Sequence, residues 1–279
     1  MKDGCSAGRF RFALMEVRAL LFHKRWLLAI VFLALYSAFT GWQTARIYLA
    51  EQQPLFGWQI LVMTFGGPFP QASAIEVVKW VSIPTAFLLS VGEPFSASAA
   101  PWNHMAMIRL PGRCCFWEGK LAAWYGVGLL FVTVTVGVGA LVQTLLLRIG
   151  RWELPPLLIL GDGFAQGPSL LVIIWVALGL LSAIWWYTTI LFICSLVISR
   201  PGTAAMVTIV TGYAITIIGA NVPTAVPYLR PALGAILNAF SLPGGMINGL
   251  AFYGIGLCLA VWLAAGVVVG YFVFRARTL

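Results

Sequence analysis

The chain is 279 residues long, and 61% of its residues are hydrophobic while only 9% are charged. Soluble domains carry about 25% charged residues, so this composition excludes a soluble globular protein and indicates an integral membrane protein. A net charge of +9 would suggest nucleic acid as the partner of a soluble protein. Here we interpret the excess as Lys and Arg at helix ends, which set membrane orientation, and we expect no nucleic-acid partner.

An amphipathic segment precedes the first long apolar run. Its apolar side chains recur every three or four residues, on one face of a helix: Phe10, Leu14, Val17 and Leu21. Its basic side chains recur every seven residues along the edge of that stripe: Arg11, Arg18 and Arg25. The pattern predicts that residues 1–25 form a helix in the cytoplasmic membrane interface, with the arginines reaching lipid phosphates. An ordinary basic segment next to the membrane is the alternative.

Six apolar runs have the length of about 20 residues that crosses a bilayer. They cover approximately residues 26–48, 74–92, 121–147, 169–198, 203–220 and 250–274. Residues 55–66 are apolar but too short to cross, so we expect them to lie at the interface or to re-enter the membrane. Residues 221–249 contain four prolines and no acid, which predicts a re-entrant or short helical segment before the sixth span.

The expected fold is therefore all-α, with residues 26–279 forming one six-span domain. Basic residues give its orientation. With a cytoplasmic N-terminus, twelve of the seventeen Lys and Arg residues lie inside, and five lie outside: Arg46, Lys79, Arg148, Arg151 and Arg230. This excess predicts that both termini are cytoplasmic. The segment between the second and third spans is then cytoplasmic as well.

Residues that could carry chemistry are scarce in the predicted spans. All eight acids lie in loops or at span ends, and both histidines, His23 and His104, are cytoplasmic. This disfavours an ion-driven transporter and excludes a zinc protease within the membrane. No P-loop is present, because six residues separate Gly112 from Gly119 and Leu121 replaces the magnesium-binding Ser or Thr. We expect no enzymatic activity and no cofactor or metal bound by this chain.

Two smaller features leave alternatives open. The adjacent Cys114 and Cys115 could carry lipid or contribute to a metal site, but unmodified thiols are the preferred interpretation. Gly266 and Gly270 lie four residues apart in the sixth span, which allows another helix to approach closely. This pair predicts a dimer face or, equally, packing within the chain.

The polar stretch RLPGRCCFWEGK (109–120) carries a degenerate motif between the second and third spans. Together with the six-span layout, it resembles the permease subunits of type-2 ABC exporters. In that family an acid ends the second span, a cytoplasmic coupling helix and a Pro-x-x-Arg turn follow, and a Gly-Lys pair opens the third span. Here Glu93 matches the acid, HMAMIRL the helix, Pro111 and Arg113 the turn, and Gly119-Lys120 the pair. The usual Gly-Thr after the acid is absent, Pro and Arg are one residue closer, and Pro101 interrupts the segment.

The resemblance implies the transmembrane subunit of an ATP-driven exporter in the plasma membrane of a bacterium. Its partners would be membrane lipid, a second permease, identical or homologous, and two P-loop ATPase subunits, which bind the ATP and magnesium. The coupling residues would be Glu93, His104, Met105, Met107, Ile108, Arg109, Pro111, Arg113 and Lys120. A loop that only set topology would not need the exposed methionines, which suit a groove on an ATPase.

Cargo would pass between the two permeases, along the first, second and fifth spans. The apolar, aromatic-rich walls favour a hydrophobic or amphipathic cargo, such as a peptide antibiotic, a drug or a lipid. The main alternative is a non-transporting membrane anchor or sensor subunit of a larger complex. A secondary transporter ranks third, because acids are missing from the spans.

Overall fold

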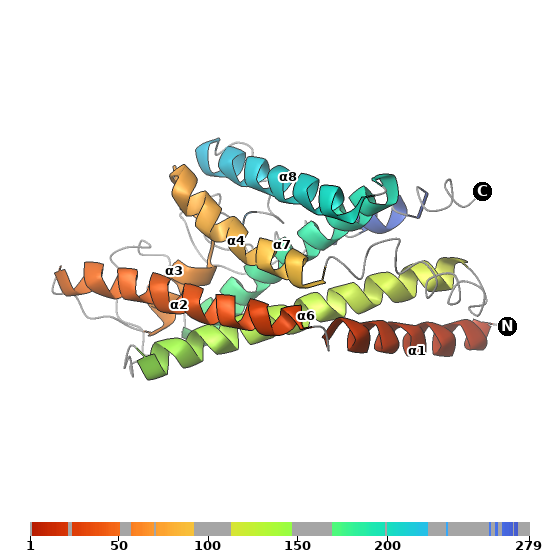
Figure 1. The fold of residues 1–279 in the computed structure, drawn as a ribbon, viewed down its shortest axis with the longest axis horizontal. Helices are drawn as coiled ribbons and strands as arrows, with labels where there is room; N and C mark the ends of the chain where they lie inside the picture. Colours follow the sequence, from red (N-terminus) through yellow and green to blue (C-terminus); the bar gives the residue numbers. More distant parts are fainter. Residues whose placement is uncertain are drawn as a thin grey trace.

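The computed structural model of the chain describes residues 2–21, 24–50, 57–69, 71–91, 113–146, 169–198 and 200–222, together with residues 233, 257, 260, 261, 264–269, 271 and 272. The helices in these ranges are α1 (Lys2–Leu21), α2 (Arg25–Ala50), α3 (Gly57–Phe65), α4 (Ala74–Val91), α6 (Arg113–Leu146), α7 (Ser169–Val197) and α8 (Pro201–Asn221). The described residues between 257 and 272 are also helical, and the described part of the chain contains no strand. The predicted all-α architecture is confirmed over these residues (Figure 1).

Within the described ranges, five helices are long and apolar enough to cross a membrane. Their apolar stretches are Arg25–Arg46, Ala74–Val91, Phe116–Leu145, Ile173–Ser195 and Gly202–Asn221. They correspond to the first five predicted spans. Most of the sixth predicted span lies outside the described residues. So do the predicted coupling helix and most of the Pro-rich segment 221–249.

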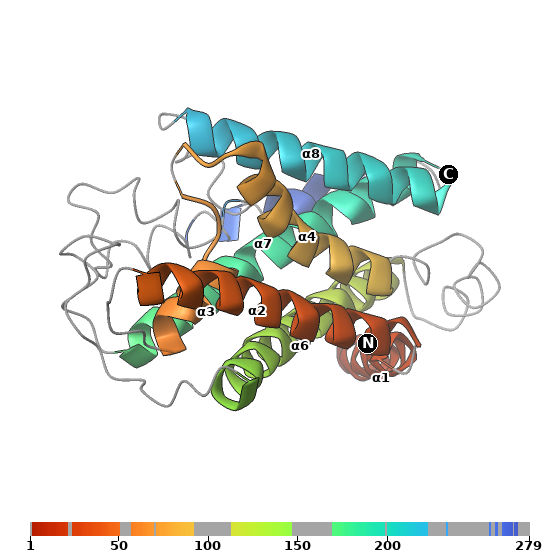
Figure 2. The same ribbon diagram turned by 60° about the vertical axis from the view of Figure 1, so that its left-hand side comes forward.

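Helix α7 is the centre of the bundle. It packs against α3, α4, α6 and α8, and Figures 1 and 2 both show it crossing behind α4. In its most apolar stretch 72% of the residues are buried, against 28% for α2. Large side chains such as Trp175 and Tyr187 are fully enclosed there. Helices α4, α6 and α8 therefore pack around α7, whose apolar stretch is the most buried of the five.

The short helix α3 lies inside the bundle. Four of its side chains, Ile60, Leu61, Val62 and Phe65, are at most 2% exposed, and it packs against α2, α6 and α7. The sequence left this segment either at the interface or re-entrant. Enclosure by three helices supports the re-entrant arrangement, because a helix of nine residues cannot cross a bilayer alone.

Hydroxyl groups in the spans bond mostly to their own helices, as expected. Thr135, Thr188, Thr208 and Thr216 each donate to the carbonyl oxygen four residues earlier, over 2.6–2.9 Å. Gln143 differs, since neither polar atom of its fully buried amide has a hydrogen-bond partner. The four threonine hydroxyls, whose protons are used within their own helices, therefore add little polarity to the helix surfaces.

Helix α1 lies along the first turns of α6 (Figures 1 and 2). Phe12 is buried against Phe116, with 5.3 Å between ring centroids. The predicted stripe begins with Phe10 and Leu14, which are 71% and 58% exposed. The helix is confirmed, and the start of its apolar stripe faces away from the protein. Its location in the membrane interface stays a prediction.

Candidate functional site

The contact between α2 and α4, here called the α2–α4 seam, contains two hollows in succession. Its α2 wall is formed by one helical face: Arg25, Leu28, Ala29, Phe32, Tyr36, Thr40 and Gln43. Its α4 wall is formed by Ser90, Leu89, Ala86, Thr85, Ser82, Lys79 and Glu76. The beginning of α2 thus faces the end of α4, so the two helices are antiparallel and share one continuous seam.

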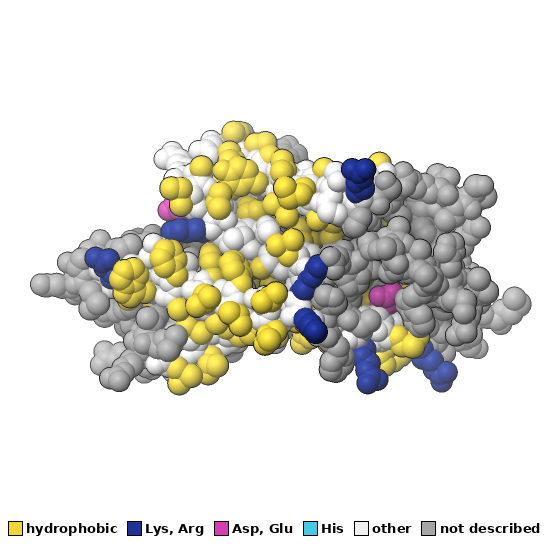
Figure 3. Space-filling model, in the orientation of Figure 1, with side chains coloured by type: hydrophobic (Ala, Val, Ile, Leu, Met, Phe, Trp, Pro, Cys, Tyr) yellow, Lys and Arg dark blue, Asp and Glu magenta, His cyan; other side chains and the backbone are white. Residues whose placement is uncertain are grey.

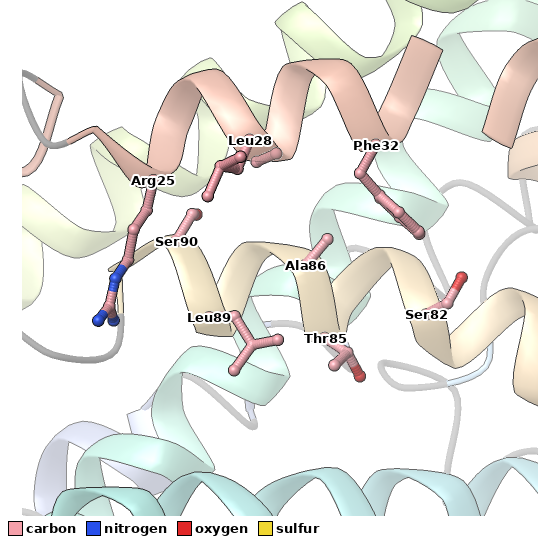
Figure 4. Close-up of a pocket in the computed structure, with 9 residues that line it drawn as sticks. Arg25, Leu28, Phe32, Ser82, Thr85, Ala86, Leu89 and Ser90 are labelled. Carbon is pink, nitrogen blue, oxygen red and sulfur yellow. The ribbon is translucent and has the colours of Figure 1, made fainter. Parts of the chain in front are cut away.

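The first hollow is an apolar groove of about 550 Å³, within the ~300–1,000 Å³ of small-molecule sites. Figure 4 shows Arg25 and Ser90 at one end of this groove and Phe32 and Ser82 at the other. Leu28 and Leu89 are 68% and 58% exposed. The groove is therefore open at the molecular surface, where the predicted spans meet lipid.

The hydroxyls in this groove contribute little polarity. Ser82 donates to the carbonyl oxygen of Lys79 at 2.6 Å, and Ser90 donates to that of Phe87 at 2.7 Å. These two protons are used within α4, whereas Thr85 is a third hydroxyl of the groove, and the rest of the described wall is mainly hydrocarbon. Among the described residues that line the groove, Arg25 carries the charge, and its guanidinium lies at one end (Figure 4).

The second hollow is a smaller, polar cavity of about 190 Å³, where the chain between α3 and α4 meets α2. Thr40 and Thr64 share a hydrogen bond of 3.1 Å across it, which ties α2 to α3. Glu76 accepts a hydrogen bond from the Ser73 backbone N–H at 2.9 Å, in a capping box that begins α4. The acid of this cavity is thus engaged by its own helix end.

Lys79 supplies the positive charge of the polar cavity. Its ammonium donates to the Gln43 amide oxygen at 3.0 Å and lies 6.0 Å from the centroid of the Phe39 ring. In the described ranges, no Asp or Glu forms an ion pair with it. Among the described residues, two of its three N–H donors therefore have no hydrogen-bond partner.

The two cations stand at opposite ends of one apolar seam. Gln43 accepts the hydrogen bond of Lys79. Arg25 and Gln43 are 18 positions apart on α2, which corresponds to about 27 Å along the helix axis. This is close to the ~30 Å thickness of the hydrocarbon core of a bilayer. Figure 3 shows hydrophobic side chains over α2, α4 and α8, with Lys and Arg near both ends of α2 and α4 and near one end of α8. The seam therefore combines an apolar groove with a basic side chain near each end.

A buried ion pair joins α1 to α6. The Lys120 ammonium lies 3.9 Å from a carboxylate oxygen of Glu16, and both side chains are almost fully buried. Burial raises the pKa of Glu16, and the charge of Lys120 acts in the opposite direction. Lys120 also lies over the Phe116 ring, 5.4 Å from its centroid. This contact connects Lys120 to α1. Its predicted part in ATPase coupling stays a prediction.

Only some of the other predicted site residues lie within the described residues. Arg113 is the first residue of α6, and Arg11 and Arg18 are exposed on α1. The remaining coupling residues lie outside the described residues: Glu93, His104, Met105, Met107, Ile108, Arg109 and Pro111.

Gly266 lies against a neighbouring helix of the same chain. A Cβ at this position would overlap the Thr189 side chain of α7. This contact supports packing within the chain for Gly266. Gly270 lies outside the described residues, and the predicted dimer face stays a prediction.

Sequence reasoning missed the seam. It assigned Arg25 to the interfacial helix and counted Lys79 only as an outside charge. One local signal was available: Ser82, Ala86 and Ser90 are small residues four apart on α4, and such a row leaves room beside a helix. The facing row on α2 could not be paired with it without the tertiary structure.

Comparisons with models of protein families, with curated proteins and with solved structures found no match for this chain. Within the described ranges, no group of three or more His, Cys, Asp or Glu residues could hold a metal ion. The candidate site is thus characterised by its own geometry, which is that of a binding seam with cationic ends.

Proposed function

We propose that this chain is the transmembrane subunit of an ATP-driven exporter, as its resemblance to type-2 ABC permeases implies. It would act in the plasma membrane of a bacterium, with both termini in the cytoplasm and with two separate P-loop ATPase subunits supplying energy. A second permease, identical or homologous, would complete the pathway. The cargo would be hydrophobic or amphipathic.

The observation that carries this proposal is one shared face of the bundle. Helix α4 contacts both α2 and α8, so the first, second and fifth predicted spans lie side by side (Figure 1). The resemblance assigns the cargo path to these three spans. Their shared face holds the open groove between Arg25 and Phe32. A second permease on this face would enclose the groove.

The length of α6 supports the mechanism. Its 34 residues extend for about 51 Å, well beyond the ~30 Å hydrocarbon core. The end that projects follows the predicted coupling segment directly, and α1 packs along it. If an ATPase moved that segment, the movement would therefore be transmitted along α6, which α1 supports over its first turns.

A pull-down in mild detergent tests the proposal. The tagged wild-type chain should bring down a P-loop ATPase from its native cells, and the double variant Met105→Asp, Ile108→Asp should lose it. Introducing an acid into an apolar helix-in-groove contact removes its complementarity. Met15→Asp is a matched control, because Met15 is an exposed methionine of α1, and it should retain the ATPase.

Two results of the pull-down would contradict the proposal. If the folded, monodisperse wild-type protein repeatedly comes down without an ATPase, the exporter proposal fails. The anchor or sensor function then takes its place. If the double variant keeps the ATPase as well as wild type does, residues 105–108 are not the coupling helix.

A further inference from the structure

We infer that the polar cavity of the α2–α4 seam binds the headgroup of a zwitterionic lipid, with its phosphate at Lys79 and Gln43 and its primary ammonium at Glu76. The cavity has a volume of about 190 Å³, and α2, α3, α4 and the chain between α3 and α4 contribute to its wall. That wall includes both a carboxylate and an ammonium group. Such a site would exist whether or not the chain is an exporter subunit.

The two charged side chains of this cavity do not neutralise each other. Glu76 and Lys79 are three residues apart on α4, where opposite charges can meet, yet no ion pair joins them. Glu76 instead accepts a hydrogen bond from the Ser73 N–H at 2.9 Å, and Lys79 donates to Gln43 across the seam at 3.0 Å. The cavity therefore presents a negative and a positive group separately. This arrangement complements a zwitterion, whereas an anion at Lys79 would also face the carboxylate.

Hydrogen-bond donors for the phosphate lie where α4 meets α2. Lys79 uses one of its three N–H groups for the amide oxygen of Gln43, so the other two can bind an acid. Because that oxygen is the acceptor, the NH₂ group of Gln43 remains a donor, and it has no hydrogen-bond partner among the described residues. A phosphate has several acceptor oxygens, so one phosphate can bind both side chains.

Glu76 supplies the acceptor for the ammonium. Its Oε2 is engaged by Ser73, whereas its Oε1 has no hydrogen-bond partner within the described ranges, and the side chain is exposed. A carboxylate accepts about four hydrogen bonds, so an ammonium can bind while the capping box stays intact. A trimethylammonium has no N–H to donate. The contact therefore favours an ethanolamine headgroup over a choline headgroup.

The cavity lies at the level of lipid headgroups if the predicted spans cross the bilayer. The apolar stretch of α2 ends at Arg46, and that of α4 begins at Ala74. Gln43 and Glu76 are within three residues of these two ends. Polar headgroups extend the bilayer from about 30 Å of hydrocarbon to about 40–45 Å in total. A headgroup is thus the zwitterion that a membrane places beside this cavity.

Exposed apolar side chains offer a path for the acyl chains. The Phe39 ring lies 6.0 Å from the Lys79 ammonium, measured to its centroid. Phe39 and Leu35 are one helical turn apart on α2, and they are 50% and 67% exposed. A lipid with its headgroup in the cavity can therefore lay its chains along α2, toward the middle of the span.

The test is native mass spectrometry of the full-length protein in detergent. The protein is titrated with phosphatidylethanolamine, phosphatidylcholine and phosphatidylglycerol that carry the same acyl chains. The first bound phosphatidylethanolamine should bind about tenfold more tightly than either other lipid, because a hydrogen bond to a charged group is worth at least that factor. Free phosphoethanolamine at the same concentration should not displace it, because it lacks the acyl chains.

Variants locate the site. Glu76→Gln removes the charge but keeps the capping box, which accepts Gln as well as Glu, and it should remove the preference over phosphatidylglycerol. Lys79→Met should weaken phosphatidylethanolamine binding about tenfold, and Lys79→Arg should retain most of it. Arg46→Gln is the matched control, because Arg46 is an exposed cation of α2 that lines neither hollow, and it should bind as wild type does. Melting temperatures without lipid show that each variant is folded.

Three results would overturn the inference. Equal affinity of the wild type for the three lipids would show that the cavity does not select a zwitterion. Unchanged selectivity in folded Glu76→Gln and Lys79→Met would place the bound lipid elsewhere. Displacement by free phosphoethanolamine at equal concentration would make the ligand a soluble zwitterion instead of a lipid. The assay uses neither ATP nor an ATPase, so the lipid site can fail while the pull-down succeeds, or the reverse.

Discussion

Two buried charged side chains connect α1 to α6. Glu16 and Lys120 come from helices that are far apart in the sequence, and each is almost removed from solvent. A buried carboxylate without a positive partner is costly. Lys120 has a further contact with the Phe116 ring, whereas Glu16 depends mainly on Lys120. Loss of the lysine should therefore be the more damaging change.

We predict that Lys120→Met lowers stability in detergent at neutral pH by about 3–5 kcal/mol, and that adding Glu16→Gln restores most of the loss. The direction in which stability changes with pH follows from the raised pKa of Glu16. Such an acid contributes stability below its ordinary pKa, and this contribution is lost as pH rises through the folded-state pKa. The single variant should thus recover on acidification. Thermal unfolding across a pH series measures this, and equal pH profiles for Lys120→Met and the double variant would contradict it.

At the scale of elements, α3 shows how a short apolar helix is accommodated. Its Phe65 side chain packs against Gly139 of α6, where a Cβ would overlap the ring. Thr40 and Thr64 add a hydrogen bond from α2. The position of α3 therefore depends on the absence of a side chain at Gly139, near the end of α6.

We predict that Gly139→Ala destabilises the protein by about 1–3 kcal/mol, because the added methyl forces Phe65 out of place. Gly137→Ala is the matched control. Nothing lies within 4 Å of a Cβ at position 137, so the better helix propensity of Ala should leave stability unchanged or raise it by up to ~1 kcal/mol. Melting temperatures of the two variants in the same detergent provide the comparison, and similar values would refute the close α3–α6 contact.

At the scale of the whole molecule, the orientation across the membrane stays a prediction from the basic residues. Lys24 and Arg25 lie at the beginning of α2, and Lys79 lies at the beginning of the antiparallel α4. Arg25 and Lys79 occupy the two ends of one apolar seam. The charges that are predicted to set topology are thus also the basic residues at the ends of the candidate binding site.

Cysteine labelling tests this orientation. In a background without the five native cysteines, Ala74→Cys at the exposed start of α4 should react with a membrane-impermeant maleimide on intact cells. Lys24→Cys, also exposed, should react only after permeabilisation, because the excess of basic residues keeps the N-terminal side in the cytoplasm. The opposite labelling pattern would show that the N-terminal side lies outside the cell. The predicted coupling segment could then not contact a cytoplasmic ATPase.

The sequence by itself determined the all-α class, the five apolar helices long enough to cross a membrane and the helix over α1. The reason is local: a run of about 20 apolar residues is suited to a bilayer whatever its neighbours are. Only the tertiary structure decided that α3 is enclosed, that Glu16 meets Lys120, and that Arg25 and Lys79 share a seam. These contacts join residues distant in the chain, and they depend on which helix faces pack together. Apolar residues on nearly every face of the spans give no periodic signal for that choice.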